Sequence, residues 1–206
     1  MPFLGDAEKA RIEEAVRQAE TKTTGEFVTV IAAKSSDYLY LPTLAAAGIV
    51  LLLSGLVLLL PLDPRIDIFY AGQVVAFIVI ALAFRWPPLT MALIPRSEQE
   101  ERARRHAHQL FLDLGLSSTK DRTGVLLFVS IAEHYVEIIA DRGVQAHVDP
   151  AVWDRIVADF TAKVRAGRIV DGFIAAIAAC TAVMAEHHPG SPDDVNELPN
   201  RLIEIR

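Results

Sequence analysis

The sequence predicts a small α/β sandwich with a mixed sheet, interrupted after its first strand by a transmembrane hairpin of two helices. Three observations support this fold class. Two long apolar runs without charged residues lie in the middle of the chain, at 38–62 and 68–84. Helix-like and strand-like patterns occur on both sides of them. The strand-like run at 123–130 is almost entirely apolar, which is typical of a central strand covered on both faces.

The chain begins with an amphipathic pattern that predicts a helix from about Asp6 to Thr21. Apolar residues at helical spacing form one face of it, and charged residues form the other. Thr24-Gly25 ends this pattern, and Glu26–Ala32 follows as a strand-like run. One helix and one strand cannot bury a core by themselves. We therefore expect segment 1–37 to be the first part of a domain that continues beyond the hairpin.

The two apolar runs have the length of membrane-spanning helices, which need about 17–25 residues. We place the hairpin at 38–94, with its helices at about 41–61 and 67–86. The link at 63–67 is charged, short and interrupted by a proline, which indicates a tight turn in water. The alternative is a pair of buried helices in a soluble domain. A chain of 206 residues has too small a core to cover both helices.

The cations that flank the hairpin predict its orientation. Five arginines follow the second helix closely and Lys34 precedes the first, whereas the link contains only Arg65. The first 22 residues contain no continuous apolar segment, so we expect no secretory signal. The sequence thus predicts a multi-pass protein of the bacterial inner membrane, with both termini and the soluble domain in the cytoplasm.

Segment 95–188 reads as the second part of the domain. Its first element is a helix at about 97–114, and Gly115 follows as a residue typical of a helix C-terminus. The strand-like runs at 123–130 and 135–141 are only four residues apart, so we expect an antiparallel hairpin. The first strand and the strand at 123–130 are joined by a crossover, which favours parallel neighbours or near-neighbours.

Two helices follow the strand hairpin. Asp149-Pro150 is a strong helix start, with aspartate as the N-cap and proline at the first helical position. A final helix runs from about Ile169 to Glu186. The remaining segment, 189–206, begins with a proline-rich and polar stretch, and we expect it to be a flexible tail.

Composition narrows the function classes. The formal net charge of −6 gives no basic footprint, so we expect no nucleic-acid partner. Cys180 is the only cysteine, which excludes an intramolecular disulfide, and its apolar spacing with Ile177 and Met184 predicts a core position. The sequence contains no phosphate-binding Gly-Lys-Ser/Thr loop, no glycine-flanked serine and no zinc spacing, so a covalent nucleophile has no evident candidate.

Strand geometry brings acidic residues together at one end of the predicted sheet. Pairing within the strand hairpin places Asp141 opposite Gly124, so Asp121 lies near the end of the third strand. A parallel first strand brings its own start, with Glu26, to the same end. Glu26, Asp121 and Asp141 are therefore candidate metal ligands, and oxygen-rich clusters of this kind suit Ca²⁺ or Mg²⁺.

Arginines accompany these carboxylates. Arg122 and Arg142 follow Asp121 and Asp141 directly, and guanidinium groups suit a phosphate or a carboxylate. Asp171, near the start of the last helix, is a further candidate, although an aspartate there often just complements the helix dipole. The alternative is that these residues form strand-end turns with surface Asp–Arg pairs, each of which contributes little.

Six blocks on the two sides of the hairpin carry a family resemblance. They are Gly25-Glu26, Phe111–Leu116, Asp121–Ser130, Val136–Val144, Trp153 and the stretch from Gly167 to Gly172. Together they resemble the TPM domain family, which includes a thylakoid-lumen acid phosphatase, photosystem II repair proteins and a modulator of levamisole receptors. The resemblance covers most of 5–33 and 96–187. It implies a small TPM-like α/β fold, an acidic strand end that binds divalent cations in some relatives, and phosphatase activity in part of the family.

Two functions are then compatible with the sequence. The first is a membrane-anchored accessory or regulatory protein, which uses the acidic strand end to bind a divalent cation or a partner protein in a membrane complex. The alternative is a metal-assisted phosphomonoesterase. In that enzyme Asp121, Asp141 and Glu26 would hold the ion, and Arg122 or Arg142 would bind the phosphoryl group.

Overall fold

The computed structural model describes residues 3–38, 40–60, 65–191 and 196–206. It divides into two compact units, one formed by Met1–Ser35 with Arg102–Arg206 and the other by Ser36–Glu101. The first unit is the α/β domain. Its elements are α1 (Asp6–Glu20), β1 (Phe27–Ala32), most of α5 (Arg96–Asp113), a 3₁₀ turn (Leu116–Ser118), β2 (Val125–Ser130), β3 (Tyr135–Ala140), α6 (Arg142–Gln145), α7 (Pro150–Arg165), α8 (Ile169–Ala185) and β4 (Leu202–Ile205).

The sheet of this domain is mixed and has the strand order β3-β2-β1-β4. β1 runs parallel to both β2 and β4, and β2 runs antiparallel to β3. The register places Val125 opposite Ala140, and the amide of Asp141 donates a hydrogen bond of 2.9 Å to the Gly124 carbonyl. The predicted mixed α/β fold, the parallel pairing of the first two strands and the hairpin register are confirmed.

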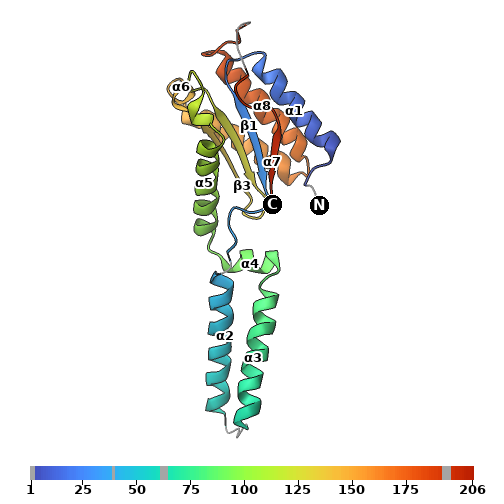
Figure 1. Ribbon diagram of the computed structural model, residues 1–206, viewed down its shortest axis with the longest axis vertical. Coiled ribbons are helices and arrows are strands. Elements are labelled where there is room, and N and C mark those ends of the chain that lie inside the picture. Colours follow the sequence, from blue (N-terminus) through green and yellow to red (C-terminus); the bar gives the residue numbers. More distant parts are fainter. Residues whose placement is uncertain (1–2, 39, 61–64, 192–195) are drawn as a thin grey trace. The chain divides into compact units, whose positions relative to one another are not determined.

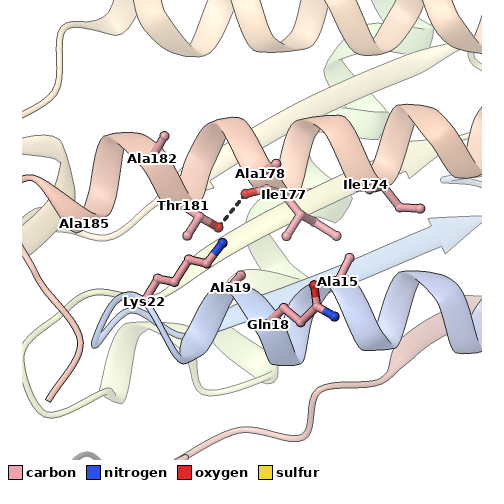
Figure 2. A pocket seen from close by; sticks show the side chains of 10 residues that line it. All are labelled: Ala15, Gln18, Ala19, Lys22, Ile174, Ile177, Ala178, Thr181, Ala182 and Ala185. Atoms are coloured by element: carbon pink, nitrogen blue, oxygen red, sulfur yellow. Dashed lines mark hydrogen bonds between the residues drawn. The ribbon is translucent and has the colours of Figure 1, made fainter. Parts of the chain in front are cut away.

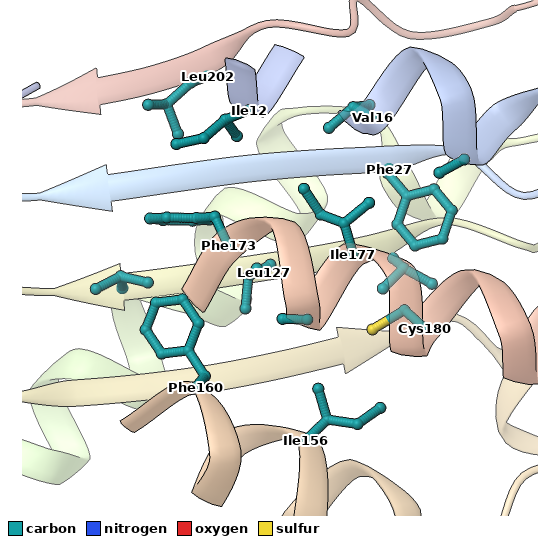
Figure 3. Packing of buried hydrophobic residues seen from close by; sticks show 14 of the residues in the cluster. Ile12, Val16, Phe27, Leu127, Ile156, Phe160, Phe173, Ile177, Cys180 and Leu202 are labelled. Atoms are coloured by element: carbon teal, nitrogen blue, oxygen red, sulfur yellow. The ribbon is translucent and has the colours of Figure 1, made fainter. Parts of the chain in front are cut away.

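Helices α1, α7 and α8 cover one face of the sheet, as the ribbon in Figure 1 shows. Phe27 and Leu127 point from the strands into this layer, and the rings of Phe160 and Phe173 meet edge to face with centroids 5.2 Å apart (Figure 3). Cys180 lies in the same core, where complete burial raises the pKa of its thiol to about 12. A core position for this cysteine is thus confirmed.

Helix α5 covers the opposite face of the sheet. Its buried side is formed by Ala103, Ala107 and Phe111, which pack on apolar residues of β1 and β2 such as Val30 and Phe128. Two alanines allow the helix to approach the strands closely. Gly115 ends this helical stretch in a left-handed conformation with φ of 79°, as the sequence predicted.

The last segment of the chain corrects one expectation. We expected 189–206 to be a flexible tail, of which 192–195 lie outside the described residues, but Leu202–Ile205 form β4 beside β1. Leu202 is buried in the main core, and its two β4 neighbours Ile203 and Ile205 pack on the α5 side. A four-residue strand in a polar surrounding gives a weak local signal, and its partner strand lies far away in the sequence.

The second unit contains α2 (Tyr40–Leu59), α3 (Ile66–Ala83) and α4 (Pro87–Leu93). Helices α2 and α3 lie side by side (Figure 1), and both are long and apolar enough to cross a membrane. Their outer faces expose large apolar side chains, up to Leu59 with 84% of its surface accessible. These features indicate membrane association, because isolated soluble domains rarely expose apolar surface of this extent.

The helix bounds in this unit differ slightly from the predicted ones. The sequence suggested that the second apolar helix reaches residue 86, but α3 ends at Ala83 and α4 starts at Pro87. Two consecutive prolines, Pro87 and Pro88, cannot continue a helix and instead occupy the first positions of a new one. The predicted turn at 63–67 lies outside the described residues at positions 63 and 64.

Candidate functional site

The amino ends of β1 and β2 and the carboxyl end of β3 meet at one end of the sheet. The amide of Val125 donates to the Glu26 carbonyl at 2.8 Å, and the amide of Asp141 donates to the Gly124 carbonyl at 2.9 Å. Backbone bonds therefore place Glu26, Gly124 and Asp141 on three adjacent strands. We call this end of the sheet the strand-end site, defined by Glu26, Asp121, Arg122, Asp141 and Arg142.

Asp121 is exposed, whereas Asp141 is buried, with 7% of its surface exposed. Its Oδ1 accepts a hydrogen bond of 2.7 Å from the amide of Arg142, so it caps the N-terminus of α6. Its Oδ2 is buried and accepts no hydrogen bond in the described part of the chain. The nearest cation is Nη1 of Arg122, at 3.9 Å. Asp141 thus presents one carboxylate oxygen that lacks full compensation for its burial.

The loop before β2 is held tightly against α6. Arg122 has a left-handed backbone with φ of 58°, and its carbonyl accepts a 3.0 Å hydrogen bond from the amide of Gly143. A Cβ at Gly143 would lie 2.5 Å from the Asp121 carbonyl oxygen and 2.7 Å from that of Arg122. Only glycine allows this close approach. The Asp121 carboxylate is exposed and has no hydrogen-bond partner among the described residues.

Glu26 lies at the same end of the sheet but serves a different contact. Its Oε1 accepts from the amide of Glu197 at 2.8 Å, and its Oε2 accepts from the amide of Leu198 at 3.2 Å. It lines a polar hollow of about 380 Å³ together with Glu20 and Asn200. Because backbone amides occupy both of its oxygens, Glu26 anchors the segment that leads into β4.

Two further findings concern the predicted metal ligands. Asp171 is exposed, pairs with Arg11 at 3.3 Å, and lies at the start of α8. The other end of this 17-residue helix, about 25 Å away, is the one that reaches the strand-end site, where the His188 carbonyl accepts from the amide of Thr24. The structure therefore does not bring Asp171 to this site. No three His, Cys, Asp or Glu side chains in the described ranges form a group that could hold a metal ion.

Three histidines border the strand-end site, and no spacing in the sequence connects His147 with His187 and His188. The rings of His147 and His187 stack with centroids 5.0 Å apart, and His188 meets His147 edge-on at 5.8 Å. His147 Nδ1 and His188 Nε2 both donate to the carbonyl of Gly143, at 3.0 and 3.1 Å. The His188 bond connects the end of α8 to α6, and only the tertiary fold places the three rings together.

A second polar group lies at the opposite end of β2. Glu133 is completely buried, and its carboxylate accepts hydrogen bonds from the Ser130 hydroxyl and, at 2.9 Å, from the amide of Ser35. It joins the turn between β2 and β3 to the segment after β1. The sequence signalled only a turn here, because an acidic residue in a four-residue loop is ordinarily solvated.

Two titratable groups between α5 and β3 have shifted pKa values. Burial raises the pKa of Glu137, although a hydrogen bond from Tyr135 and the charges of His108 and Arg104 lower it in part. Burial lowers the pKa of His106, and the charge of Glu133 opposes this shift. Glu137 Oε2 and His106 Nδ1 are buried without a hydrogen-bond partner in the described structure.

A surface groove of about 240 Å³ runs between α1 and α8. Alanines make up half of its lining residues, and Figure 2 shows the Lys22 side chain extending from one end of the groove toward Thr181. The hydroxyl of Thr181 is already used, since it donates to the Ile177 carbonyl at 2.7 Å. The groove offers few groups that could orient a substrate, so we do not assign chemistry to it.

Comparisons with known proteins agree with this fold. A family described as the TPM domain matches residues 88–183. The NMR structure of the BA42 protein from the psychrophilic bacterium Bizionia argentinensis is similar, with a TM-score of 0.63, 20% identity, and coverage of 98% of this chain and 96% of that chain. No curated protein matches the sequence. The family match includes α5, β2, β3, α6, α7 and most of α8, and therefore most of the strand-end site. Residues 88–183 of this chain are a TPM domain.

Proposed function

We propose that the protein is a membrane-anchored accessory module whose TPM domain binds a divalent cation, Ca²⁺ or Mg²⁺, at Asp121 and Asp141. The single observation that supports this most directly is the buried Asp141 Oδ2 without a hydrogen bond. A buried carboxylate oxygen is costly unless a cation or a donor compensates it. Arg122 at 3.9 Å supplies only a distant charge, and 54% of its side chain is exposed.

The donor set fits a hard cation. Asp141 Oδ2 and the exposed carboxylate of Asp121 are oxygen ligands, and the loop that carries Asp121 is fixed against α6 by Gly143. Ca²⁺ and Mg²⁺ prefer such ligands and take further ones from carbonyl groups or water. When bound, the ion would neutralise Asp141 and link the loop before β2 to α6. Glu26 is left out of this proposal because two amides occupy its carboxylate.

The test is a cation titration of the full-length protein in detergent micelles. A ligand that binds only the folded state stabilises it by about 2.7 kcal/mol at a hundredfold excess over its Kd. We therefore expect millimolar CaCl₂ or MgCl₂ to raise the unfolding temperature. Asp141→Asn removes the charge but keeps a good N-cap, and it should abolish the increase. An unchanged unfolding temperature of the wild type would contradict the proposal.

Asp149→Asn is the matched control. Asp149 also caps a helix with its carboxylate, because its Oδ1 accepts a hydrogen bond of 2.9 Å from the amide of Ala151. The control should respond to the cation like the wild type, whereas Asp121→Asn should respond less. Equal responses of Asp121→Asn, Asp141→Asn and Asp149→Asn would mean that the cation binds elsewhere.

A metal-assisted phosphomonoesterase is the second candidate, and Arg122 favours it. Its Nη1 lies 3.9 Å from Asp141 and donates a hydrogen bond to the Ser117 carbonyl, and the remaining N–H groups of this half-exposed guanidinium would bind phosphoryl oxygens. The ion would supply Lewis-acid chemistry when bound. Release of phosphate from an aryl phosphate ester by the pure protein distinguishes the two functions. Activity that is lost both with a chelator and in Arg122→Gln would support the enzyme, and inactivity with either ion would support the accessory module.

The membrane part of the proposal places α2 and α3 across the bilayer, with both termini and the TPM domain in the cytoplasm. It is supported by the length and apolarity of the two helices and by the arginines that follow α3. Reporter fusions to the chain ends and to the 63–67 link test it. Extracytoplasmic chain ends would contradict the orientation.

A further inference from the structure

The apolar hairpin contains one amide side chain close to the middle of a helix. Gln73 lies seven residues after the start of α3 and ten before its end, so about 10 and 15 Å of helix flank it. If α3 spans the bilayer, as the proposed function has it, this amide lies near the midplane. Polar side chains at that depth are unfavourable unless they have hydrogen-bond partners.

The hydrogen bonds of Gln73 are incomplete. A side-chain amide has two N–H donors and a carbonyl oxygen that can accept two bonds. Nε2 of Gln73 donates to the hydroxyl of Ser54 on α2, and that hydroxyl donates to the Val50 carbonyl at 2.7 Å. In the described part of the chain this is the only hydrogen bond of the amide. One N–H and the carbonyl oxygen are left for a partner outside the hairpin.

The surface beside Gln73 allows another helix to approach. A groove of about 230 Å³ between α2 and α3 is lined by Ser54, Gln73 and Gly72 among apolar residues. A Cβ at Gly72 would meet nothing within 4 Å, so the backbone of α3 is accessible there. Small residues beside a polar one are typical of helix–helix contacts in membranes, where hydrogen bonds and close packing drive association.

We propose that the protein forms a homodimer in the membrane, in which Gln73 of each copy forms an amide–amide pair with Gln73 of the other. An amide is self-complementary, because across a twofold axis the N–H of each copy meets the carbonyl of the other. A second copy therefore satisfies both remaining groups at once. No like charges oppose this contact within α2 and α3, since Asp67 is the one charged residue of these two helices and it pairs with Arg65 at the start of α3.

The experiment measures energy transfer between copies of the full-length protein that carry donor or acceptor fluorescent proteins at the N-terminus. The proteins are reconstituted in phosphatidylcholine vesicles over a range of protein-to-lipid ratios. We expect ratio-dependent transfer for the wild type. Gln73→Leu should weaken the dimer about tenfold, the effect of losing interhelical hydrogen bonds of this kind. Gln73→Asn, which keeps an amide, should retain most of the transfer.

Two controls separate the dimer contact from the contact within the hairpin. Ser54→Ala removes the internal partner of Gln73 but leaves the amide, so dimerisation should persist. Val79→Leu changes an exposed apolar residue of the same helix and should have no effect. Helicity measured by circular dichroism shows whether each variant is folded.

Three results would overturn the inference. These are a monomeric wild type at every ratio, transfer that is unchanged in Gln73→Leu, or a complex in native membranes with a different protein only. Alkaline carbonate extraction distinguishes these results from a failure of the proposed function. Membrane anchoring is retained if the monomeric protein stays in the membrane fraction, and it is refuted if the protein is released.

Discussion

Substitution of Gly143 by alanine tests whether the loop before β2 is fixed against α6. The new Cβ would lie 2.5 Å from the Asp121 carbonyl oxygen and 2.7 Å from that of Arg122, well inside ordinary contact. Both obstacles are backbone atoms, and the Arg122 carbonyl also accepts the 3.0 Å hydrogen bond from Gly143. The loop must therefore move away and strain that bond.

The magnitude follows from three contributions. Overpacking costs about 1–3 kcal/mol, and weakening one backbone hydrogen bond costs about 0.5–1.5 kcal/mol. Alanine is a better helix former than glycine, and this difference offsets up to about 1 kcal/mol of the loss. We expect Gly143→Ala to lower the free energy of unfolding by about 2 kcal/mol and to reduce the cation response of Asp141.

The assay is urea unfolding of the full-length protein in micelles, followed by circular dichroism. Gly5→Ala is the control, because a Cβ at Gly5 would meet only Glu8 Oε2, at an ordinary 3.5 Å. If Gly143→Ala is as stable as this control, the loop before β2 can move freely. The geometric argument for the strand-end site would then be wrong.

Three further predictions concern buried side chains. Glu133→Ala leaves the Ser130 hydroxyl and the Ser35 amide without their acceptor, so thermal unfolding should show a loss of about 3 kcal/mol. Glu137→Gln should stabilise the protein at neutral pH, because burial of the charged carboxylate is unfavourable and raises the pKa of Glu137. The contribution of protonated Glu137 to the free energy of unfolding is complete below about pH 4.3, the pKa in the unfolded chain, and is lost as the pH rises through the folded pKa. Urea unfolding against pH should therefore show a flatter profile for this variant, and an unchanged profile would contradict the burial argument. Cys180, with its pKa raised to about 12, should resist iodoacetamide in the folded protein and react only after denaturation, as mass spectrometry would show.

Local signals allowed most of the fold to be predicted. Asp149 and Pro150 mark a helix start by their own chemistry, and Gly115 marks a helix end, so each needs no knowledge of distant residues. The four-residue link between β2 and β3 fixes their register, so the sequence alone predicts that Asp141 lies opposite Gly124. The amphipathic pattern and the two long apolar runs likewise predicted where the long helices lie.

The remaining features depend on long-range contacts. β4 is a strand only because β1 offers an unpaired edge, and Glu26 is an anchor only because the amides of Glu197 and Leu198 reach it. The meeting of His147 and His188 on one carbonyl requires α6 and α8 in place. A single sequence contains each of these residues but not the distances between them, so their roles could not be predicted.

The position of β1 in the sheet also bears on how the protein is synthesised. Both strands that flank β1 are translated after the hairpin, and β4 comes at 202–205. All six residues of β1 are buried in the folded domain, so a nascent chain holds an apolar strand with two open edges while α2 and α3 emerge. Such edges template wrong pairing and aggregation. Under the proposed anchoring, the hairpin enters the bilayer before the sheet can close, and a chaperone that shields β1 during translation would raise the yield of folded protein.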